Sequence, residues 1–188
     1  MSINRRVYLD CEFLPNVGEL YGLLSIGLVD DKGNTLYKVN RNAYWNTARN
    51  ITFHRENTLP HIPLVDSAGG GYFIDRTAPE GATPGQIQIE VAKFFEGYDR
   101  HETCVYAWCG AQDLYRLHSL WNHDWVDMPD TIPHWFYDLE AIMQEHDIPK
   151  TILPAQDEAT RHHALYDAIH DEAVHHAMME YLVNKDLV

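Results

Sequence analysis

Short runs of apolar residues, separated by polar turns, fill much of the first half of the chain, and apolar residues at helical spacing fill much of the second. Runs over residues 6–12, 22–29, 35–40 and 103–109 have the length and composition of β-strands. Between the second and third runs, Asp30-Asp31-Lys32-Gly33-Asn34 predicts a hairpin turn. Apolar residues that recur every three or four positions predict helices over residues 84–96, 111–121, 135–146 and 164–182. This order of elements predicts an α/β fold.

Two segments lack such a period and are expected to be loops. Residues 60–84 are rich in Gly, Pro, Asp and Thr and include Gly69-Gly70-Gly71. Because no Gly-Lys-Ser/Thr sequence follows, we expect these glycines to provide flexibility rather than a phosphate-binding loop. Residues 148–161 contain two prolines and lead to His162. No repeat or linker divides the chain, so residues 1–188 are expected to form one domain.

Two carboxylates lie in the first predicted strand. Side chains alternate across a strand, so Asp10 and Glu12 are expected on one face and Cys11 on the other. Neighbouring carboxylates raise each other's pKa unless a cation lies between them. Oxygen ligands suit hard cations such as Mg²⁺ and Mn²⁺. The pair therefore indicates a metal site, and the alternative is an acidic pair that ends an edge strand and faces solvent.

Two further acids and a histidine extend this pattern. Asp113 follows the strand predicted over residues 103–109. Asp167 lies in the first turns of the last predicted helix, where the helix dipole favours a negative charge. His162 precedes Asp167 by five residues. This spacing alone is weak in a chain with 12 histidines, but the order of all five residues points to metal-assisted hydrolysis of a phosphodiester.

These residues resemble the motifs of the DEDDh-type 3′–5′ exonucleases. The first motif of that family, Asp-x-Glu, is matched by Asp10 and Glu12, and its second, an aspartate at the start of a helix, by Asp113. The third motif is matched by His162-His163-Ala164-Leu165-Tyr166-Asp167-Ala168. Within the family, the chain resembles the RNase T-like subgroup, which includes a mycobacterial 3′–5′ exoribonuclease. That likeness covers nearly the whole chain and rests on residues 10–13, on Ser25-Ile26-Gly27 and on residues 107–113.

The resemblance implies a ribonuclease-H-like fold, with a mixed sheet flanked by helices, and a single exonuclease domain. It also implies two Mg²⁺ or Mn²⁺ ions held by Asp10, Glu12, Asp113 and Asp167. His162, rather than the adjacent His163, has the spacing of the general base. The expected reaction releases nucleoside 5′-monophosphates from single-stranded 3′ ends, with RNA preferred over DNA. Because RNase T-like enzymes are often homodimers, a homodimer is expected.

Two positions depart from the pattern of many DNA-directed members of the family. Phe13 stands where those members have Thr. Gln112 stands just before Asp113, where they carry an Asn and an aromatic residue. These differences separate the chain from polymerase proofreading domains. They leave the choice of sugar open, with 3′–5′ exodeoxyribonuclease activity as the alternative.

Composition is typical of a compact cytoplasmic enzyme. A chain of 188 residues with 45% hydrophobic residues can bury roughly 70% of its unfolded surface. No segment approaches the roughly 18 apolar residues of a membrane span, and the N-terminus lacks a signal-peptide pattern. The three cysteines are widely spread and do not suggest a disulfide framework. We therefore expect a cytoplasmic location and no membrane partner.

The net charge of −14 is unusual for a protein that binds nucleic acid, since long polyanions usually require a basic surface. Cations and aromatic rings nevertheless alternate over residues 37–55, which suits a short single strand. The candidate substrate-binding residues are Phe13, Arg41, Trp45, Arg49 and Arg55. The alternative is a solvated loop whose rings pack against the body. Either way, the charge predicts weak binding of long nucleic acid and a preference for short or frayed 3′ ends.

Some other residues have the chemical type of site residues but do not occupy positions of the family motifs. Asp138 and Asp171 are possible ligands by type alone, and His170-Asp171 resembles the doublet of HD phosphohydrolases. An HD-type phosphohydrolase and a non-catalytic nucleic-acid-binding module are the alternative functions. We also expect His175 and His176 to lie on the solvated side of the last helix. The tryptophans expected in the core are Trp108, Trp121 and Trp135.

Overall fold

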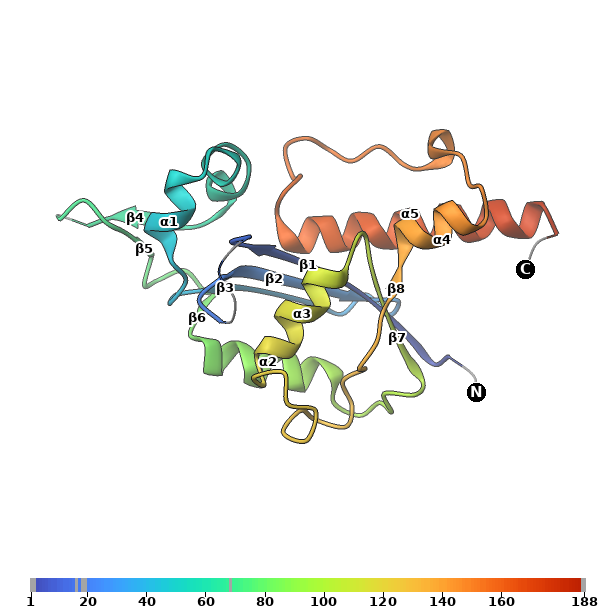
Figure 1. Cartoon of the computed structure of the whole chain (residues 1–188), viewed down its shortest axis with the longest axis horizontal. Coiled ribbons are helices and arrows are strands. Elements are labelled where there is room, and N and C mark those ends of the chain that lie inside the picture. Colours follow the sequence, from blue (N-terminus) through green and yellow to red (C-terminus); the bar gives the residue numbers. More distant parts are fainter. Residues whose placement is uncertain (1–2, 16, 18–19, 68, 187–188) are drawn as a thin grey trace.

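A six-stranded mixed sheet lies at the centre of the computed structural model, which describes residues 3–15, 17, 20–67 and 69–186 (Figure 1). The strands are β1 (Arg5–Phe13), β2 (Leu23–Asp30), β3 (Thr35–Asn40), β6 (Gly81–Ala82), β7 (Thr103–Ala107) and β8 (Tyr137–Asp138). Their order in the sheet is β6-β3-β2-β1-β7-β8. The pairs β1–β2 and β2–β3 are antiparallel, and the pairs β1–β7, β7–β8 and β3–β6 are parallel.

Helices cover both faces of this sheet, which confirms the predicted α/β architecture. On one face lie α2 (Pro84–Phe95) and α3 (Ala111–Ser119), and on the other lie α4 (Leu139–Glu145) and α5 (Ala164–Asn184) (Figure 1). The side chains of β1 alternate between two cores. Leu9 and Cys11 belong to the core beneath α2 and α3, whereas Tyr8 belongs to the core beneath α5. The even-numbered residues that follow Tyr8 therefore face α5.

The start of α5 packs directly onto the sheet at Gly27. A Cβ atom at this position would lie 2.3 Å from the carbonyl carbon and oxygen of Ala164. Any larger residue would therefore push the helix away from β2. Gly27 is paired with Asp10 of β1, and paired residues of an antiparallel ladder face the same side. This close approach places the first turn of α5 beside Asp10.

The segment between β3 and β6 is more structured than its sequence suggests. It contains α1 (Trp45–Asn50), the π-helical turn η1 (His54–Thr58), the 3₁₀ turn η2 (Leu59–His61) and a hairpin of β4 (Leu64–Asp66) and β5 (Tyr72–Ile74). The expected loop over residues 60–84 thus holds three short strands. Strands of two or three residues show too little alternation to be recognised from sequence. The whole segment lies beyond the carboxyl end of β1 (Figure 1).

The helix predicted over residues 135–146 is shorter than expected. Tyr137 and Asp138 instead pair with β7 as β8, and α4 begins at Leu139. Asp138 caps this helix, since its Oδ1 accepts a hydrogen bond from the backbone N–H of Ala141 at 3.1 Å. A second short 3₁₀ turn, η3 (Lys150–Ile152), interrupts the predicted loop that leads to α5.

Two expectations about ring burial are wrong. His175 is buried rather than solvated, because its ring stacks on Tyr106 with centroids 4.2 Å apart and its Nδ1 lies 2.9 Å from the hydroxyl of Tyr8. Burial lowers the pKa of His175 to about 4. Trp135 is exposed rather than in the core, in the segment before β8, against the ring of His101 at 5.7 Å. Trp121 is buried as expected.

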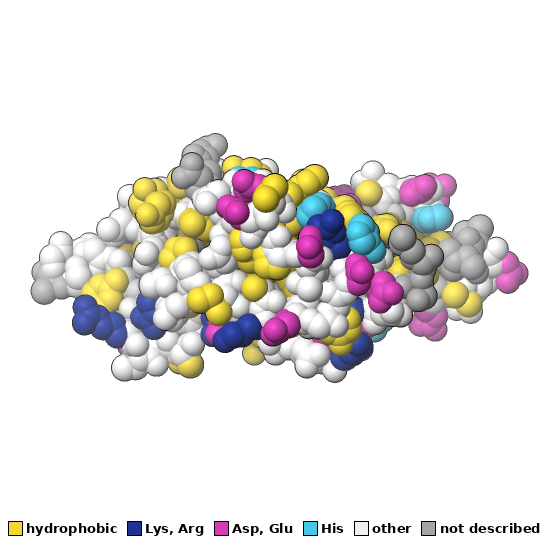
Figure 2. Space-filling model, turned by 90° about the horizontal axis from the view of Figure 1, so that it is seen from below, with side chains coloured by type: hydrophobic (Ala, Val, Ile, Leu, Met, Phe, Trp, Pro, Cys, Tyr) yellow, Lys and Arg dark blue, Asp and Glu magenta, His cyan; other side chains and the backbone are white. Residues whose placement is uncertain are grey.

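The visible surface offers no obvious track for a polyanion. On the face shown in Figure 2, the Lys and Arg side chains of the described residues are scattered among acidic and apolar groups instead of forming a continuous basic stripe. Within the described part of the chain, none of the helices has both the length and the apolar character needed to cross a membrane.

Candidate active site

A cavity of about 630 Å³ lies at the carboxyl end of β1. Side chains from β1, from the segment of α1 and η1, and from the start of α5 line it. Four of the five residues of the predicted site belong to this lining: Asp10, Glu12, His162 and Asp167. Apolar walls complete it, among them Phe13, Phe53 and the partly buried Trp108. The cavity therefore combines an acidic floor with aromatic sides.

Asp10 and Glu12 point to the same side of β1. They are paired with Gly27 and Ser25 of β2, on the face that α5 covers. Because β1 is a central strand and Glu12 is only 7% exposed, the alternative of an acidic pair on a solvated edge strand is excluded. Burial raises the pKa of Glu12 to about 8, against the opposing effect of a hydrogen bond from Thr58. Burial, and then the charges of Asp113 and Glu12, also raise the pKa of Asp10.

Asp113 approaches the same acids from α3. The pairing of β1 with β7 ends at Tyr8, opposite Tyr106. The backbone N–H of Cys11 is therefore not bonded to β7 and is free to donate to Asp113. Oδ1 of Asp113 accepts this N–H at 2.9 Å, which satisfies a buried backbone donor. The buried carboxylate thus lies beside the main chain that joins Asp10 to Glu12, and Asp113 is not among the described residues that line the cavity. Burial raises the pKa of Asp113 to about 7.

Asp167 is held by hydrogen bonds to both of its carboxylate oxygens. It lies in the first turn of α5. The side-chain amide of Gln156 donates to Oδ1, and the backbone N–H of His162 donates to Oδ2 at 3.0 Å. Burial raises the pKa of Asp167, although Gln156 and His162 oppose this effect. The orientation of the carboxylate is therefore fixed by the loop that precedes α5.

His162 adopts a left-handed backbone conformation, with φ of 64°. This conformation is uncommon outside glycine and costs energy, which often marks a functional position. The hydrogen bond from its N–H to Asp167 helps to hold it. Its ring meets Phe53 edge-to-face, with centroids 4.9 Å apart, and lines the cavity. Burial lowers the pKa of His162, which favours the neutral form of the ring, and a neutral imidazole can accept a proton.

The neighbouring His163 has different surroundings. Its ring stacks on Tyr37 of β3 with centroids 4.2 Å apart, and it tilts against Tyr166 at 4.6 Å. It is the N-cap residue of α5 and lies outside the cavity lining. Of these two adjacent histidines, His162 therefore has its ring at the acids.

The arrangement fits a hard divalent cation. Ligand atoms of Glu12, His162 and Asp167 all lie within 4.8 Å of one another. Oδ2 of Asp10 is buried and has no hydrogen-bond partner among the described residues, a state that a bound cation would complete. Oxygen-rich sites suit Mg²⁺ or Mn²⁺, and a cation would relieve the repulsion between the carboxylates. His162 also lies near enough to be a ligand, a role not expected from the sequence.

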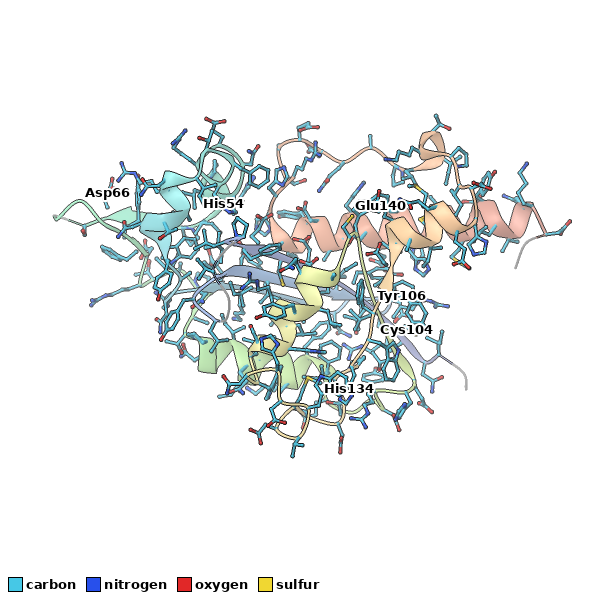
Figure 3. The ribbon with its side chains drawn as sticks, viewed as in Figure 1. His54, Asp66, Cys104, Tyr106, His134 and Glu140 are labelled. Atoms are coloured by element: carbon cyan, nitrogen blue, oxygen red, sulfur yellow. The ribbon has the colours of Figure 1, made fainter. Side chains whose placement is uncertain are left out.

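Thr58 and Gln156 contact the proposed metal-binding acids although no sequence pattern marks them. The hydroxyl of Thr58 donates to Oε2 of Glu12 at 2.8 Å. Oγ1 of Thr58 also lies 3.1 Å from Nδ1 of His54, which projects from η1 near the end of the sheet (Figure 3). Thr58 is 46 residues from Glu12 in the sequence, and Gln156 is 11 residues from Asp167. Only the fold could reveal them.

Asp171 also lines the cavity, although the family motifs do not include a residue at its position. It is 6% exposed and lies one helical turn beyond Asp167. Its Oδ2 accepts the backbone N–H of Trp108 at 3.0 Å. The contact ties α5 to the turn between β7 and α3, and therefore to the helix that carries Asp113. Burial raises the pKa of Asp171 to about 8.

Two of the candidate substrate-binding residues are held by contacts within the protein. The guanidinium of Arg41 donates to the backbone carbonyls of four residues, which are Asp75, Arg76, Ala78 and Gly81. Trp45 is 3% exposed, and its indole N–H donates to the carbonyl of Asn40 at 3.1 Å. Both side chains are occupied by packing within the segment between β3 and β6. This packing disfavours contact of either side chain with a substrate.

The other three candidates remain accessible. Phe13 lines the cavity. Arg49 lies over the ring of Tyr72, 4.4 Å from its centroid. Arg55 is exposed and pairs with Glu56 at 3.4 Å. Contact of these residues with a substrate stays a prediction.

No protein-family model matches the chain. The chain is similar to proteins named 3′-5′ exoribonuclease from two strains of Mycobacterium tuberculosis. Each is 27% identical over 165 residues, which cover 87% of this chain and 86% of the relative. Among solved structures, it is similar to two of exonuclease I. Their TM-scores are 0.58 and 0.55, at 13% and 10% identity, over 96% and 98% of this chain.

The chain spans 44% of the length of each of these two exonuclease I chains. At such low identity the likeness shows the fold alone. It agrees with the ribonuclease-H-like mixed sheet that the sequence resemblance implies.

Proposed function

We propose that this chain is a metal-dependent 3′–5′ exonuclease that shortens single-stranded RNA and releases nucleoside 5′-monophosphates. One observation carries the proposal. Glu12, Asp167 and His162 converge in one cavity with Asp10, whose buried Oδ2 has no hydrogen-bond partner among the described residues. The direction of cleavage and the preference for RNA are supported by the similarity to proteins named 3′-5′ exoribonuclease.

Each residue of the site has a role in this proposal. Asp10, Glu12, Asp113 and Asp167 would hold two Mg²⁺ or Mn²⁺ ions, which supply positive charge to the phosphodiester and lower the pKa of water. Thr58 and Gln156 orient the carboxylates of Glu12 and Asp167. The neutral imidazole of His162 accepts the proton of the attacking water.

The shape of the cavity favours a single strand. Phe13 and Phe53 line it, and aromatic rings bind unpaired bases by stacking with little preference among them. Phe53 is 49% exposed and already touches His162, so a base on this ring would lie next to the proposed general base. Discrimination between RNA and DNA requires contact with the 2′-hydroxyl, and the RNA preference rests on the relatives alone.

Oligonucleotides labelled at one end test this function. A 5′-labelled single strand should give a ladder that shortens from the 3′ end, and a 3′-labelled strand should release a labelled mononucleotide at once. Both reactions should require Mg²⁺ or Mn²⁺ and stop in excess chelator, and matched RNA and DNA strands compare the sugars. An early labelled mononucleotide from the 5′ end would contradict the direction. An HD-type phosphohydrolase would instead hydrolyse mononucleotides even after replacement of Asp10 and Glu12. A non-catalytic binding module would bind the strand and show no turnover.

A further inference from the structure

The cavity presents a problem of charge, because a phosphodiester strand must approach a group of carboxylates in a protein of net charge −14. Arg161 is the one Lys or Arg among the described residues that line the cavity. Arg41 is occupied by backbone carbonyls elsewhere, and the face shown in Figure 2 has no continuous basic stripe among the described residues. Among the described residues of the lining, Arg161 is therefore the one cationic side chain that could attract a phosphate in addition to the proposed metal ions.

The main chain of Arg161 is held in place. Its N–H donates to the carbonyl of Asp157 at 3.1 Å. The next residue, His162, is fixed through its own N–H to Asp167. Arg161 is thus adjacent in the chain to the proposed general base and on an ordered turn, so its guanidinium works from a defined point at the cavity.

Among the described residues, the guanidinium of Arg161 has one ionic partner, and that contact is weak. Nη1 of Arg161 lies 3.4 Å from Oε1 of Glu158, with the two side chains 51% and 83% exposed. Exposed pairs of this kind contribute little, because water screens them and ordering two long side chains costs entropy. A phosphate offers the same planar fork two acceptor oxygens and a charge-assisted contact. An arriving phosphate can therefore replace Glu158.

We propose that Arg161 binds a backbone phosphate of the single strand at the cavity mouth and exchanges its pairing with Glu158 for that phosphate. The proposal rests on the proposed nuclease function, and it names the cation that binds the substrate there. Arg161 acts on binding, whereas His162 acts on the proton transfer. The two adjacent residues thus divide substrate binding from chemistry.

The test compares Arg161→Ala with Lys93→Ala in the full-length protein. Lys93 forms an exposed ion pair with Glu90 on α2, three residues earlier, at 3.3 Å. Arg161 forms the same type of pair with Glu158. Each of the two variants therefore loses one positive charge and one surface ion pair. KM and kcat are measured with Mg²⁺ on a 5′-labelled single strand, and kcat/KM is followed against salt concentration. Arg161→Lys and Glu158→Gln complete the set, and thermal unfolding checks that each variant is folded.

For Arg161→Ala, KM should rise about ten- to a hundredfold, the value of a charged hydrogen bond, with a smaller change in kcat. The slope of log kcat/KM against log salt should weaken by about 0.7, since one cation fewer displaces counterions from a single strand. Arg161→Lys should restore the slope and part of the KM, because Lys keeps the charge but not the fork. Glu158→Gln should lower KM a few-fold, and Lys93→Ala should match the wild type.

A KM and salt slope for Arg161→Ala equal to those of Lys93→Ala would overturn the proposal, and wild-type turnover in the same assay would leave the nuclease function intact. A fall in kcat alone would overturn it as well. If Arg161→Ala does not fold, Arg161→Gln replaces it with the same expected changes in KM and slope. If the wild type neither cleaves nor binds the strand, the nuclease function fails, and this proposal fails with it.

Discussion

Replacing Glu12 by Gln should stabilise the metal-free protein at neutral pH. Glu12 is buried, and burial is the main reason that the pKa of its carboxyl rises from 4.5 to about 8. Between these values the folded protein holds a proton that the unfolded chain has released, so the free energy of unfolding falls as pH rises. With about 1.4 kcal/mol per pKa unit, Glu12 alone removes about 2 to 3 kcal/mol between pH 5 and pH 7.

Gln at this position does not titrate, and its carbonyl oxygen can still accept the hydroxyl proton of Thr58. In chelator at pH 7, Glu12→Gln should therefore be more stable than the wild type by about 2 to 3 kcal/mol, and the difference should nearly vanish at pH 5. Denaturant unfolding at pH 5, 6, 7 and 8 measures it. Glu145→Gln, on the exposed surface of α4, is the control with the same change of charge.

Divalent cations should reverse this order. Because Mg²⁺ would bind the folded wild type and not the unfolded chain, it should raise the stability of the wild type and do much less for Glu12→Gln. Equal stability of Glu12→Gln and Glu145→Gln at every pH in chelator would contradict a raised pKa of Glu12. A metal-free wild type that is as stable at pH 8 as at pH 5 would contradict it as well.

Three further predictions concern the base, the helix contact and assembly. His162→Ala should lose about 10²–10⁴-fold in kcat yet still bind Mn²⁺ in a calorimetric titration, whereas His163→Ala should be mild; a dead His163→Ala with an active His162→Ala would reverse the assignment. Gly27→Ala should cost about 1–3 kcal/mol of stability and weaken metal binding, because the start of α5 must shift; unchanged unfolding would show that the helix adapts freely. A homodimer is expected from the resemblance, and a monomeric mass by light scattering would remove that expectation.

Local periodicity was enough to predict the main elements and the placement of the first two acids. The alternation of β1 puts Asp10 and Glu12 on one face and Cys11 in the opposite core, because side-chain direction in a strand depends only on sequence parity. The helical period of α5 likewise predicts Asp167 in its first turns. Such features need no knowledge of the rest of the chain.

Contacts between distant segments could not be predicted in this way. Interleaved cations and rings suggested a substrate surface, but Arg41 and Trp45 are occupied by the packing of residues 40–82. His175 reads as polar, yet the rings of Tyr8 and Tyr106 give it an apolar site with a hydrogen-bond partner. The hydrogen bond from Gln156 to Asp167 depends on the path of a loop without period. Each of these features becomes visible only when the fold brings the segments together.

The proposed nuclease activity requires a divalent cation at the acidic cavity, and a comparison of rates tests this requirement. Hydrolysis of a 5′-labelled single-stranded RNA is measured for the wild type and for Asp10→Ala, with Mg²⁺ and with excess chelator, after unfolding curves show that both proteins are folded. Turnover is expected only for the wild type with Mg²⁺, since Asp10 carries the buried oxygen that lacks a hydrogen-bond partner among the described residues. Full wild-type activity in chelator, or an active Asp10→Ala, would show that hydrolysis does not depend on a cation held by Asp10.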